Sequence, residues 1–305
     1  MIEKGDHASS HSGKKTIRIS RRAFLGLAAA ATTALATYSV GVEPSRLVVR
    51  RDTIPICGLP RALDGLKIGQ LSDPHRCPFV PRARVERAVA LLAAEELDLV
   101  ALTGDFVSYW PGYADEYPEV LAPLQAPLGS FACLGNHDHY TDPDVVAAAL
   151  RDAGVTVLRN QHQIVAVNGE PLCIVGIDDI GRSGISLHHA EPADDLPAAL
   201  ADSPTSDMVR VLLAHNPDAV MREVFAEETA RRPIALTLSG HTHGGQVQIP
   251  LIGPPFVPSQ YGQLFSGGLV QAAGTQVYVS RGTGSSWPLR FNCQPEINVL
   301  TLRSA

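Results

Sequence analysis

The sequence lacks several features that mark common functional classes. Its five cysteines are widely spaced and include no Cys-x-x-Cys pair, which argues against a zinc ribbon or a thioredoxin-type site. No basic stripe with interleaved aromatic residues occurs, so we expect no nucleic-acid partner. A Gly-x-x-x-x-Gly-Lys phosphate loop is absent, and neither Ser183-Gly184 nor Ser285-Ser286 lies in a nucleophile elbow. A serine nucleophile is therefore a poor alternative.

Charged residues (18%) and aromatic residues (6%) are scarce, whereas apolar residues make up 45% of the 305 positions. This composition supplies enough hydrophobic material for a buried sheet and excludes a disordered chain. The odd number of cysteines leaves at least one thiol unpaired, and the pairing of the others stays open. No internal repeat or long low-complexity linker appears, so we predict a single catalytic domain after an amino-terminal leader.

The amino terminus has the form of an export signal, because five basic residues precede an uncharged run from Ala23 to Val42. Within it, Ser20-Arg21-Arg22-Ala23-Phe24-Leu25-Gly26 resembles the twin-arginine signal, which export machinery reads as an address. We predict an export signal over residues 1–42 and the catalytic domain over residues 43–305. The expected location is the periplasm or cell envelope.

Two fates of this leader stay open. About twenty apolar residues can also span a bilayer, so the leader could be retained as a membrane anchor. Alternatively, Ala34-Leu35-Ala36 offers a small-x-small cleavage site. Residues 1–36 carry six Lys or Arg and two Asp or Glu, so cleavage would change the formal net charge from −6 to −10.

The rest of the chain alternates short apolar runs with helical patterns, which is typical of a layered α/β protein. A helix is expected over residues 82–97, and a second should begin near Asp142-Pro143 and stop at Gly154. Ligands of such folds collect beyond the carboxyl ends of the strands. The expected strands are Leu66–Leu71, Leu97–Thr103, Gly129–Leu134, Leu172–Ile177, Met208–Ala214, Ile234–Ser239 and Gln276–Ser280.

Five polar clusters follow five of these strands and contain residue types that bind divalent metals. Taken alone, each is weak, because Asp-x-His or Gly-Asp is usually a turn and a single histidine usually belongs to the core. The closing His-x-His is a stronger metal signal. Five such clusters in this order would rarely arise by chance. They are Asp73-Pro74-His75, Gly104-Asp105, Gly135-Asn136-His137-Asp138, His215 and Gly240-His241-Thr242-His243.

This order of clusters resembles the full motif set of the calcineurin-like metallophosphoesterases. The later Gly244-Gly245-Gln246-Val247 and Ser280-Arg281-Gly282-Thr283-Gly284 are similar to an exported or membrane-associated bacterial branch of that family. The resemblance implies a four-layer α/β/β/α sandwich, in which helices flank two mixed sheets and a dinuclear metal centre lies at the strand ends.

The resemblance also implies a role for each residue. One ion would be held by Asp73, His75, His243 and a bridging Asp105. The other would be held by Asp105, Asn136, His215 and His241. His137 matches the non-ligand histidine that protonates the leaving oxygen, and Asp138 matches its orienting partner. The mild departure is Pro74, which we expect to restrict Asp73 to extended backbone geometry.

Two ions of this kind activate a water and clamp phosphate oxygens, and the mixed ligand set suits Mn, Fe or Zn. We therefore expect a phosphoester hydrolase of the cell envelope, acting on a phosphodiester that is lipid- or glycan-linked. The alternatives are a pyrophosphate hydrolase acting on a nucleotide-linked lipid precursor, and a metal-binding protein without turnover. Retention of His137 disfavours the last of these.

An aromatic cluster runs from Phe106 to Tyr117, directly after the bridging Asp105. Its rings could pack the loop onto the body, as aromatic side chains most often do. They could instead contact the non-phosphate part of a substrate, such as a sugar or acyl chain. In that case the Gly- and Pro-rich segment from Pro250 to Phe265 would form an opposing wall.

Overall fold

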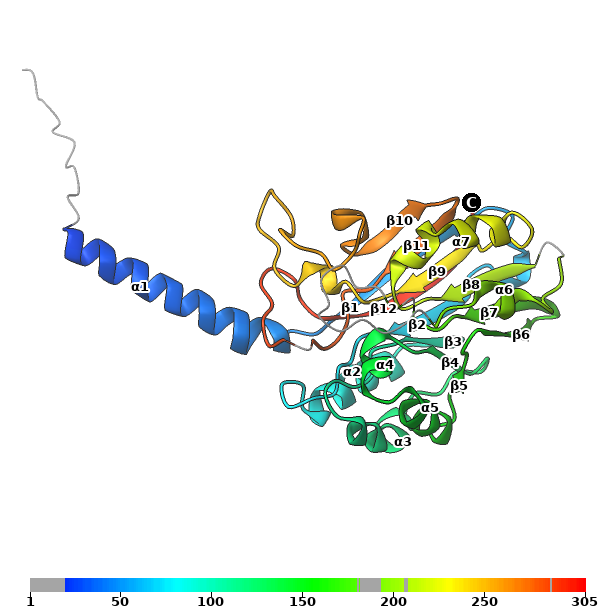
Figure 1. Cartoon of the computed structure of the whole chain (residues 1–305), viewed down its shortest axis with the longest axis horizontal. Helices are drawn as coiled ribbons and strands as arrows, with labels where there is room; N and C mark the ends of the chain where they lie inside the picture. The colour runs from blue at the N-terminus through cyan, green and yellow to red at the C-terminus, as the bar shows by residue number, and fades with distance from the viewer. Residues whose placement is uncertain (1–19, 180, 182–192, 206–207, 286) are drawn as a thin grey trace, which may run out of the picture. The chain divides into compact units, whose positions relative to one another are not determined.

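The chain divides into two compact units, Met1–Thr37 and Tyr38–Ala305. The computed structural model describes residues 20–179, 181, 193–205, 208–285 and 287–305 (Figure 1). The first unit contains helix α1 (Arg21–Thr37), whose side chains are all outside any core. From Arg21 to Ser45 the chain is helical over 25 residues, long and apolar enough to cross a membrane. A signal sequence and an anchor both fit this helix, and the predicted boundary at residue 42 stays a prediction.

The second unit is built on two six-stranded mixed sheets. The first has the order β1-β12-β2-β3-β4-β5, and the second has the order β10-β11-β9-β8-β7-β6. The first-sheet strands are β1 (Val48–Ile56), β12 (Glu296–Ser304), β2 (Lys67–Leu71), β3 (Leu99–Thr103), β4 (Ser130–Cys133) and β5 (Thr156–Val157). The second-sheet strands are β10 (Gly268–Ala272), β11 (Thr275–Val279), β9 (Leu236–Ser239), β8 (Val209–Leu213), β7 (Glu170–Gly176) and β6 (Gln161–Val167).

Helices cover the outer face of each sheet, which confirms the expected four-layer sandwich (Figure 1). The first sheet is covered by α2 (Arg82–Ala93), α3 (Tyr117–Leu121) and α5 (Pro143–Asp152), and the second by α6 (Leu196–Leu200) and α7 (Glu223–Thr229). A short helix α4 (Asn136–Thr141) follows β4. The 3-10 turns are Glu43–Ser45, Arg61–Leu63, Pro111–Glu116, Pro217–Met221, His243–Gly245 and Gly262–Phe265, and Tyr38–Val42 is a π-helical turn.

Side-chain alternation along the strands produces the layers. In β3, Leu99 and Ala101 point into the core between the sheets, whereas Val100 and Leu102 pack against the helices. In β7, Leu172 and Ile174 likewise face the first sheet, because successive side chains of a strand point to opposite faces. The parallel central strands are therefore buried on both faces and appear in the sequence as continuous apolar runs.

All seven predicted strands are confirmed within two residues at their ends. Helix α5 begins where expected, since the Asp142 side chain accepts from the backbone N–H groups of Asp144 and Val145. It ends before Gly154, which has a φ of 79°. Helix α2 ends at Ala93, four residues before the predicted Leu97, because the chain must already turn into β3. The five cysteines are all free, and Cys133 and Cys173 are buried.

Polar contacts join the two sheets next to the strand ends. Gln70 of β2 donates from Nε2 to the Ser239 carbonyl of β9 at 2.9 Å. His215, directly after β8, places Nδ1 2.7 Å from the Thr103 carbonyl of β3. These buried hydrogen bonds fix the carboxyl ends of β3, β8 and β9 against one another, which is where the predicted ligands lie.

Candidate metal centre

The predicted ligands come from five turns, three on the first sheet and two on the second. Asp73 and His75 follow β2, Asp105 follows β3 and Asn136 follows β4. His215 follows β8, and His241 and His243 follow β9. All seven are buried, and the structure brings six of them together at the carboxyl ends of both sheets. The seventh, Asn136, lies between Gly135, which packs against Asp105, and His137, whose backbone N–H donates to Asp105 Oδ1.

The backbone is left-handed at most of these positions. Asp73, His75, Asp105, His241 and His243 have φ values of 51°, 47°, 57°, 67° and 50°. Residues with a side chain rarely adopt this region, and each such residue costs roughly 1–2 kcal/mol. The expectation that Pro74 holds Asp73 in extended geometry is wrong. Hydrogen bonds from Asp73 N to Gly104 O and from His75 N to Asp105 O hold the turn instead.

Glycines allow the turns to approach one another closely. A Cβ added at Gly135 would lie 2.3 Å from Asp105 Oδ1, and one at Gly240 would lie 2.1 Å from Asp73 Oδ2. Both distances are shorter than any real contact of a Cβ atom. The glycines before Asn136 and His241 are therefore required by the packing of neighbouring ligand turns.

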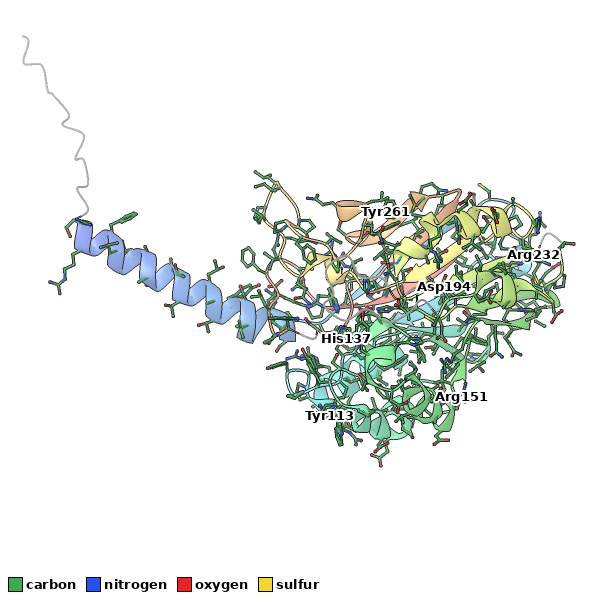
Figure 2. The ribbon with its side chains drawn as sticks, in the orientation of Figure 1. Tyr113, His137, Arg151, Asp194, Arg232 and Tyr261 are labelled. Atoms are coloured by element: carbon green, nitrogen blue, oxygen red, sulfur yellow. The ribbon has the colours of Figure 1, made fainter. Side chains whose placement is uncertain are left out.

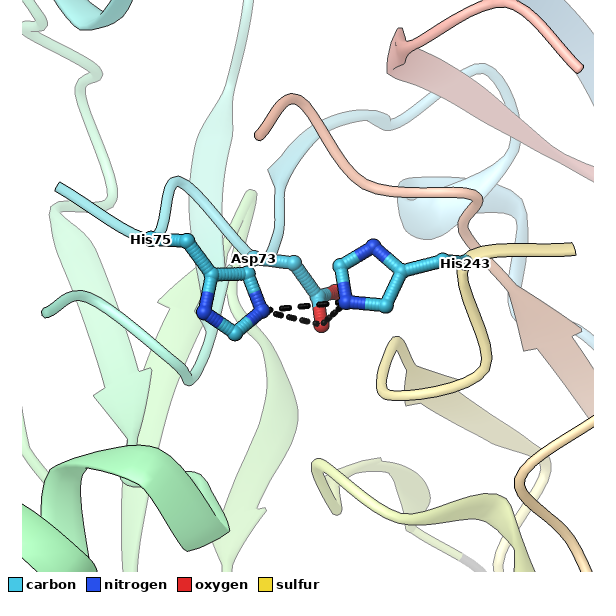
Figure 3. A group of neighbouring side chains, drawn as sticks. All are labelled: Asp73, His75 and His243. Atoms are coloured by element: carbon cyan, nitrogen blue, oxygen red, sulfur yellow. Dashed lines mark hydrogen bonds and ion pairs between the residues drawn. The ribbon is translucent and has the colours of Figure 1, made fainter. Parts of the chain in front are cut away.

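One group of donors consists of Asp73, His75 and His243 (Figure 3). His75 Nε2 lies 3.0 Å from His243 Nε2, and His243 Nε2 lies 3.4 Å from Asp73 Oδ1. Figure 3 shows the two imidazoles and the carboxylate pointing toward one another. Two ring nitrogens this close would repel through their lone pairs unless a proton or a cation lies between them.

A second group consists of Asp105, His215 and His241. Asp105 Oδ2 lies 3.2 Å from His215 Nε2 and 3.3 Å from His75 Nε2, so one carboxylate faces both groups. The carbonyl of Thr103 can only accept, so His215 Nδ1 carries a proton, and in the neutral ring Nε2 presents its lone pair to the centre. Asp105 is therefore in the position of a bridging ligand.

Asn136 supplies a direct test of whether a cation fits. Asn136 is buried, and its side-chain Oδ1 has no hydrogen-bond partner within the described part of the chain. A buried amide oxygen without a partner is costly, and a divalent cation would satisfy it. The donor set of carboxylate, imidazole and amide groups thus fits two divalent ions.

The pKa shifts differ among the predicted ligands. Burial lowers the pKa of His75, His243 and His241, the last to about 3, so these rings are neutral and free to act as ligands. Burial raises the pKa of Asp73 to about 7. Burial alone would lower the pKa of His215, but the Asp105 carboxylate outweighs it and raises that pKa. Among the described ion pairs, none joins a Lys or Arg to Asp73 or Asp105, so bound cations would neutralise these carboxylates.

His137 belongs to neither of these two groups but forms a third group of possible donors with His75 and Asp105. Its ring stands perpendicular to that of His75, with centroids 4.7 Å apart. Ser108, which sequence reasoning missed, joins the two rings: its Oγ is 2.8 Å from His75 Nδ1 and 3.3 Å from His137 Nδ1. If His75 uses Nε2 as a ligand, its Nδ1–H donates to Ser108, and the Ser108 hydroxyl donates to His137. The proton of a neutral His137 then lies on Nε2.

The hydrogen bonds recorded for Asp138 within the described residues go to backbone amides. Its Oδ2 accepts from Asp105 N at 2.8 Å and from Gly135 N at 2.9 Å. Its Oδ1 accepts from Phe106 N at 2.8 Å and from Val107 N at 3.2 Å. We therefore reassign Asp138 from partner of His137 to the group that shapes the turn carrying Asp105.

Arg290 is a second residue that the sequence did not single out. Its guanidinium is buried, donates to the carbonyls of Arg281 and Gly284 at 2.8 and 2.7 Å, and lies 3.3 Å from His243 Nδ1. It therefore holds the loop after β11 against the His243 turn. The sequence feature that could have identified Arg290 is its isolation, since it is the single charged residue between Gly282 and Pro295.

The aromatic cluster after Asp105 serves two purposes. Phe106 and Tyr117 are buried and pack edge to face with centroids 5.5 Å apart, which fixes the loop to the body. Tyr109 and Trp110 are 63% and 58% exposed. The segment after His243 folds back onto its own start, since a Cβ at Gly245 would meet the Phe256 carbonyl at 2.3 Å. In the view of Figure 2, His137 lies between Tyr113, from the loop after Asp105, and Tyr261, from the segment after His243.

Comparison with known proteins adds independent information. The family model described as calcineurin-like phosphoesterase matches residues 66–245. The chain is 35% identical to the phosphodiesterase YaeI of Escherichia coli over 290 residues, covering 93% of this chain and 99% of that protein. It is 34% identical to the uncharacterized metallophosphoesterase YkuE of Bacillus subtilis over 299 residues, covering 94% and 99%. It is 26% identical to the UDP-2,3-diacylglucosamine pyrophosphatase LpxG of Chlamydia trachomatis, covering 90% and 96%.

Proposed function

The chain belongs to the calcineurin-like phosphoesterase family of metal-dependent phosphoester hydrolases, and from this premise we propose that it is a phosphodiesterase of the cell envelope. The observation that carries the proposal is the convergence of buried donors from both sheets, namely Asp73, His75, Asp105, His215, His241 and His243. The likeness to a protein named phosphodiesterase, over nearly the full length of both chains, supports the choice of a diester.

The residue roles form part of this proposal. Asp73, His75 and His243 would hold one ion, Asn136, His215 and His241 would hold the other, and Asp105 would contribute to both. The imidazole, carboxylate and amide donors favour Mn, Fe or Zn. Ions held there supply Lewis-acid polarisation of the phosphoryl oxygens and a water of lowered pKa.

The remaining chemistry belongs to the chain itself. His137 donates the proton on Nε2 to the leaving oxygen, as a general acid. Ser108 fixes which nitrogen of His137 carries that proton, through the contacts with His75 and His137. Asp138 holds Asp105 in its left-handed turn through the backbone N–H groups of residues 105–107 and 135.

Location is proposed from the leader. The twin arginines at Arg21 and Arg22, followed by an apolar helix, support export by the twin-arginine route. The substrate would then be an envelope phosphoester, with a lipid- or glycan-linked moiety contacting Tyr109 and Trp110 at the rim.

A second candidate is hydrolysis of a pyrophosphate in a nucleotide-linked lipid. The similarity to a protein named UDP-2,3-diacylglucosamine pyrophosphatase favours it, although the identity is 26%. Export would separate the protein from a cytoplasmic nucleotide precursor, so we place this second.

The test begins with full-length protein stripped of metal by a chelator. We expect no hydrolysis of a phosphodiester, and recovery when Mn, Fe or Zn is added. Asp105→Asn should lose both metal and activity, whereas the matched control Asp144→Asn, an exposed carboxylate in α5, should keep both.

Comparing a phosphodiester, a phosphomonoester and a pyrophosphate then separates the candidates. A strong preference for the pyrophosphate would favour the second. Full activity with metal content confirmed near zero would overturn the metal-dependent mechanism.

A further inference from the structure

Three loops next to the metal centre expose large apolar side chains to solvent. The first carries Leu251 and Ile252, the second Trp287 and Leu289, and the third Tyr109 and Trp110. We call these six residues the apolar rim. We propose that the apolar rim is a docking surface for a lipid bilayer, which holds the catalytic domain with its active site close to the membrane. This proposal does not depend on which phosphoester is hydrolysed.

Each rim loop is attached to a ligand turn, so the rim lies beside the active site. Tyr109 directly follows Ser108, which contacts His75. The loop of Trp287 begins at Gly284 and Ser285, where Gly284 N donates to the Asp73 carbonyl at 2.8 Å. The loop of Leu251 follows Gln248, whose backbone N–H donates to the Phe291 carbonyl at 2.9 Å. The loops of Leu251 and Trp287 therefore leave the body side by side.

The loop of Leu251 ends in a turn whose side chains point into solvent. Ile249 and Gly253 exchange two backbone hydrogen bonds at 3.0 and 2.9 Å, which closes a tight turn. Leu251 lies in that turn at φ 69° and is fully exposed, and Ile252 is 66% exposed. A strained turn that displays two aliphatic side chains to water gains little in the isolated protein, and burying them in acyl chains would be favourable.

Charge distribution distinguishes this surface from the rest of an acidic protein. The chain has a formal net charge of −6, yet no charged residue occurs from Gly244 to Ser280. Between Gly282 and Pro295 the one charged residue is Arg290, and it is buried. In these two loops, tryptophan and aliphatic residues without charge match the composition of segments that lie in the membrane interface.

Chain connectivity favours a bilayer over a second copy or another protein. The apolar stretch from Arg21 to Ser45 is long enough to span a membrane. Residues near the end of this stretch form hydrogen bonds next to the loop of Trp287. Arg290 N donates to the Ser39 carbonyl and Cys293 N donates to Glu43 Oε1, both at 2.9 Å. A leader retained in the membrane would therefore continue, in sequence, into residues that contact the loop of Trp287.

The chain itself provides the probe. It contains two tryptophans, Trp110 and Trp287, and both belong to the apolar rim, being 58% and 70% exposed. Their fluorescence in the full-length protein therefore reports on the rim and on nothing else. We would reconstitute the protein in vesicles of phosphatidylethanolamine and phosphatidylglycerol, with and without brominated acyl chains. Emission should shift to shorter wavelength and be quenched by the brominated lipid, and Trp110→Phe and Trp287→Phe would assign each contribution.

A matched pair of variants tests the surface. Leu251→Asp with Ile252→Asp should largely abolish quenching of Trp287, while the melting temperature and the hydrolysis of a small soluble diester stay unchanged. Ile164→Asp, an exposed position on the edge strand β6, should leave quenching as in the parent protein.

Two results would overturn the proposal. One is the absence of lipid quenching in the reconstituted parent protein while it still hydrolyses the soluble diester. The other is conversion of a dimer to a monomer by the double substitution without a change in quenching, which would make the rim a subunit interface.

Discussion

Replacing Asp138 by asparagine separates the structural role of this carboxylate from a catalytic one. The carboxylate accepts four backbone N–H bonds, two on each oxygen, from Gly135, Asp105, Phe106 and Val107. Asparagine keeps one oxygen and places an NH2 group where two N–H donors point. Two bonds to a charged acceptor are lost, and each contributes about 1.5–3 kcal/mol.

These losses sum to roughly 3–6 kcal/mol of unfolding free energy. Removing the charge also relieves repulsion from Asp105, which together with burial raises the pKa of Asp138 to about 7. The relief offsets part of the loss, so we expect a value near 3 kcal/mol. For a domain of this size that corresponds to a melting temperature lowered by roughly 6 °C or more.

Thermal unfolding of metal-free and metal-loaded protein measures the effect. Asp144→Asn is the matched control, because the Asp144 side chain is 87% exposed and pairs with Arg159 at 2.7 Å. An exposed pair of this kind contributes at most about 1 kcal/mol. If Asp138→Asn melted like the control but lost turnover, the carboxylate would act on His137, as the sequence predicted, and our reassignment would fail.

Three further predictions test the centre and the leader. His137→Ala should keep both ions by metal analysis yet lose roughly a hundred- to ten-thousand-fold in rate, and an emptied site would contradict its role as an acid. Ser108→Ala should lower kcat about tenfold or more with KM little changed, whereas Ser108→Thr, which keeps the hydroxyl, should restore it; equal loss in both would show a packing role. Arg21→Lys with Arg22→Lys should leave the protein in the cytoplasm on fractionation, and unchanged appearance in the envelope would refute the twin-arginine route.

The ligand clusters could be predicted from the sequence because strand ends leave a local signal. A buried strand is a continuous apolar run, and the first polar residues after it lie at the sheet edge, as Asp105 does after Leu99–Thr103. Strand β1 has no such signal. Its middle residues, Arg50, Arg51 and Asp52, are exposed, and it forms an edge strand only because β12 returns beside it from the end of the chain.

The partners of Asp138 and the backbone of Asp73 depend on contacts that no local pattern encodes. Asp138 accepts hydrogen bonds from the amides of a turn about thirty residues earlier, a contact that its neighbours in the sequence do not indicate. Pro74 normally favours an extended residue before it, but the hydrogen bond from Asp73 N to the next strand's Gly104 carbonyl overrides that preference. Ser108 was missed because a lone serine carries no signal until both histidines lie beside it.

The division of the ligands between the two sheets has a consequence for biosynthesis. The first sheet's turns, from Asp73 to Asn136, leave the ribosome early, whereas His215, His241 and His243 emerge only when most of the chain has been made. Each proposed ion needs ligands from both groups, so no nascent fragment can assemble a complete coordination shell. Metal capture would then coincide with closure of the finished fold. A protein exported already folded, by the proposed twin-arginine route, would draw its ions from the cytoplasmic supply and carry them across the membrane.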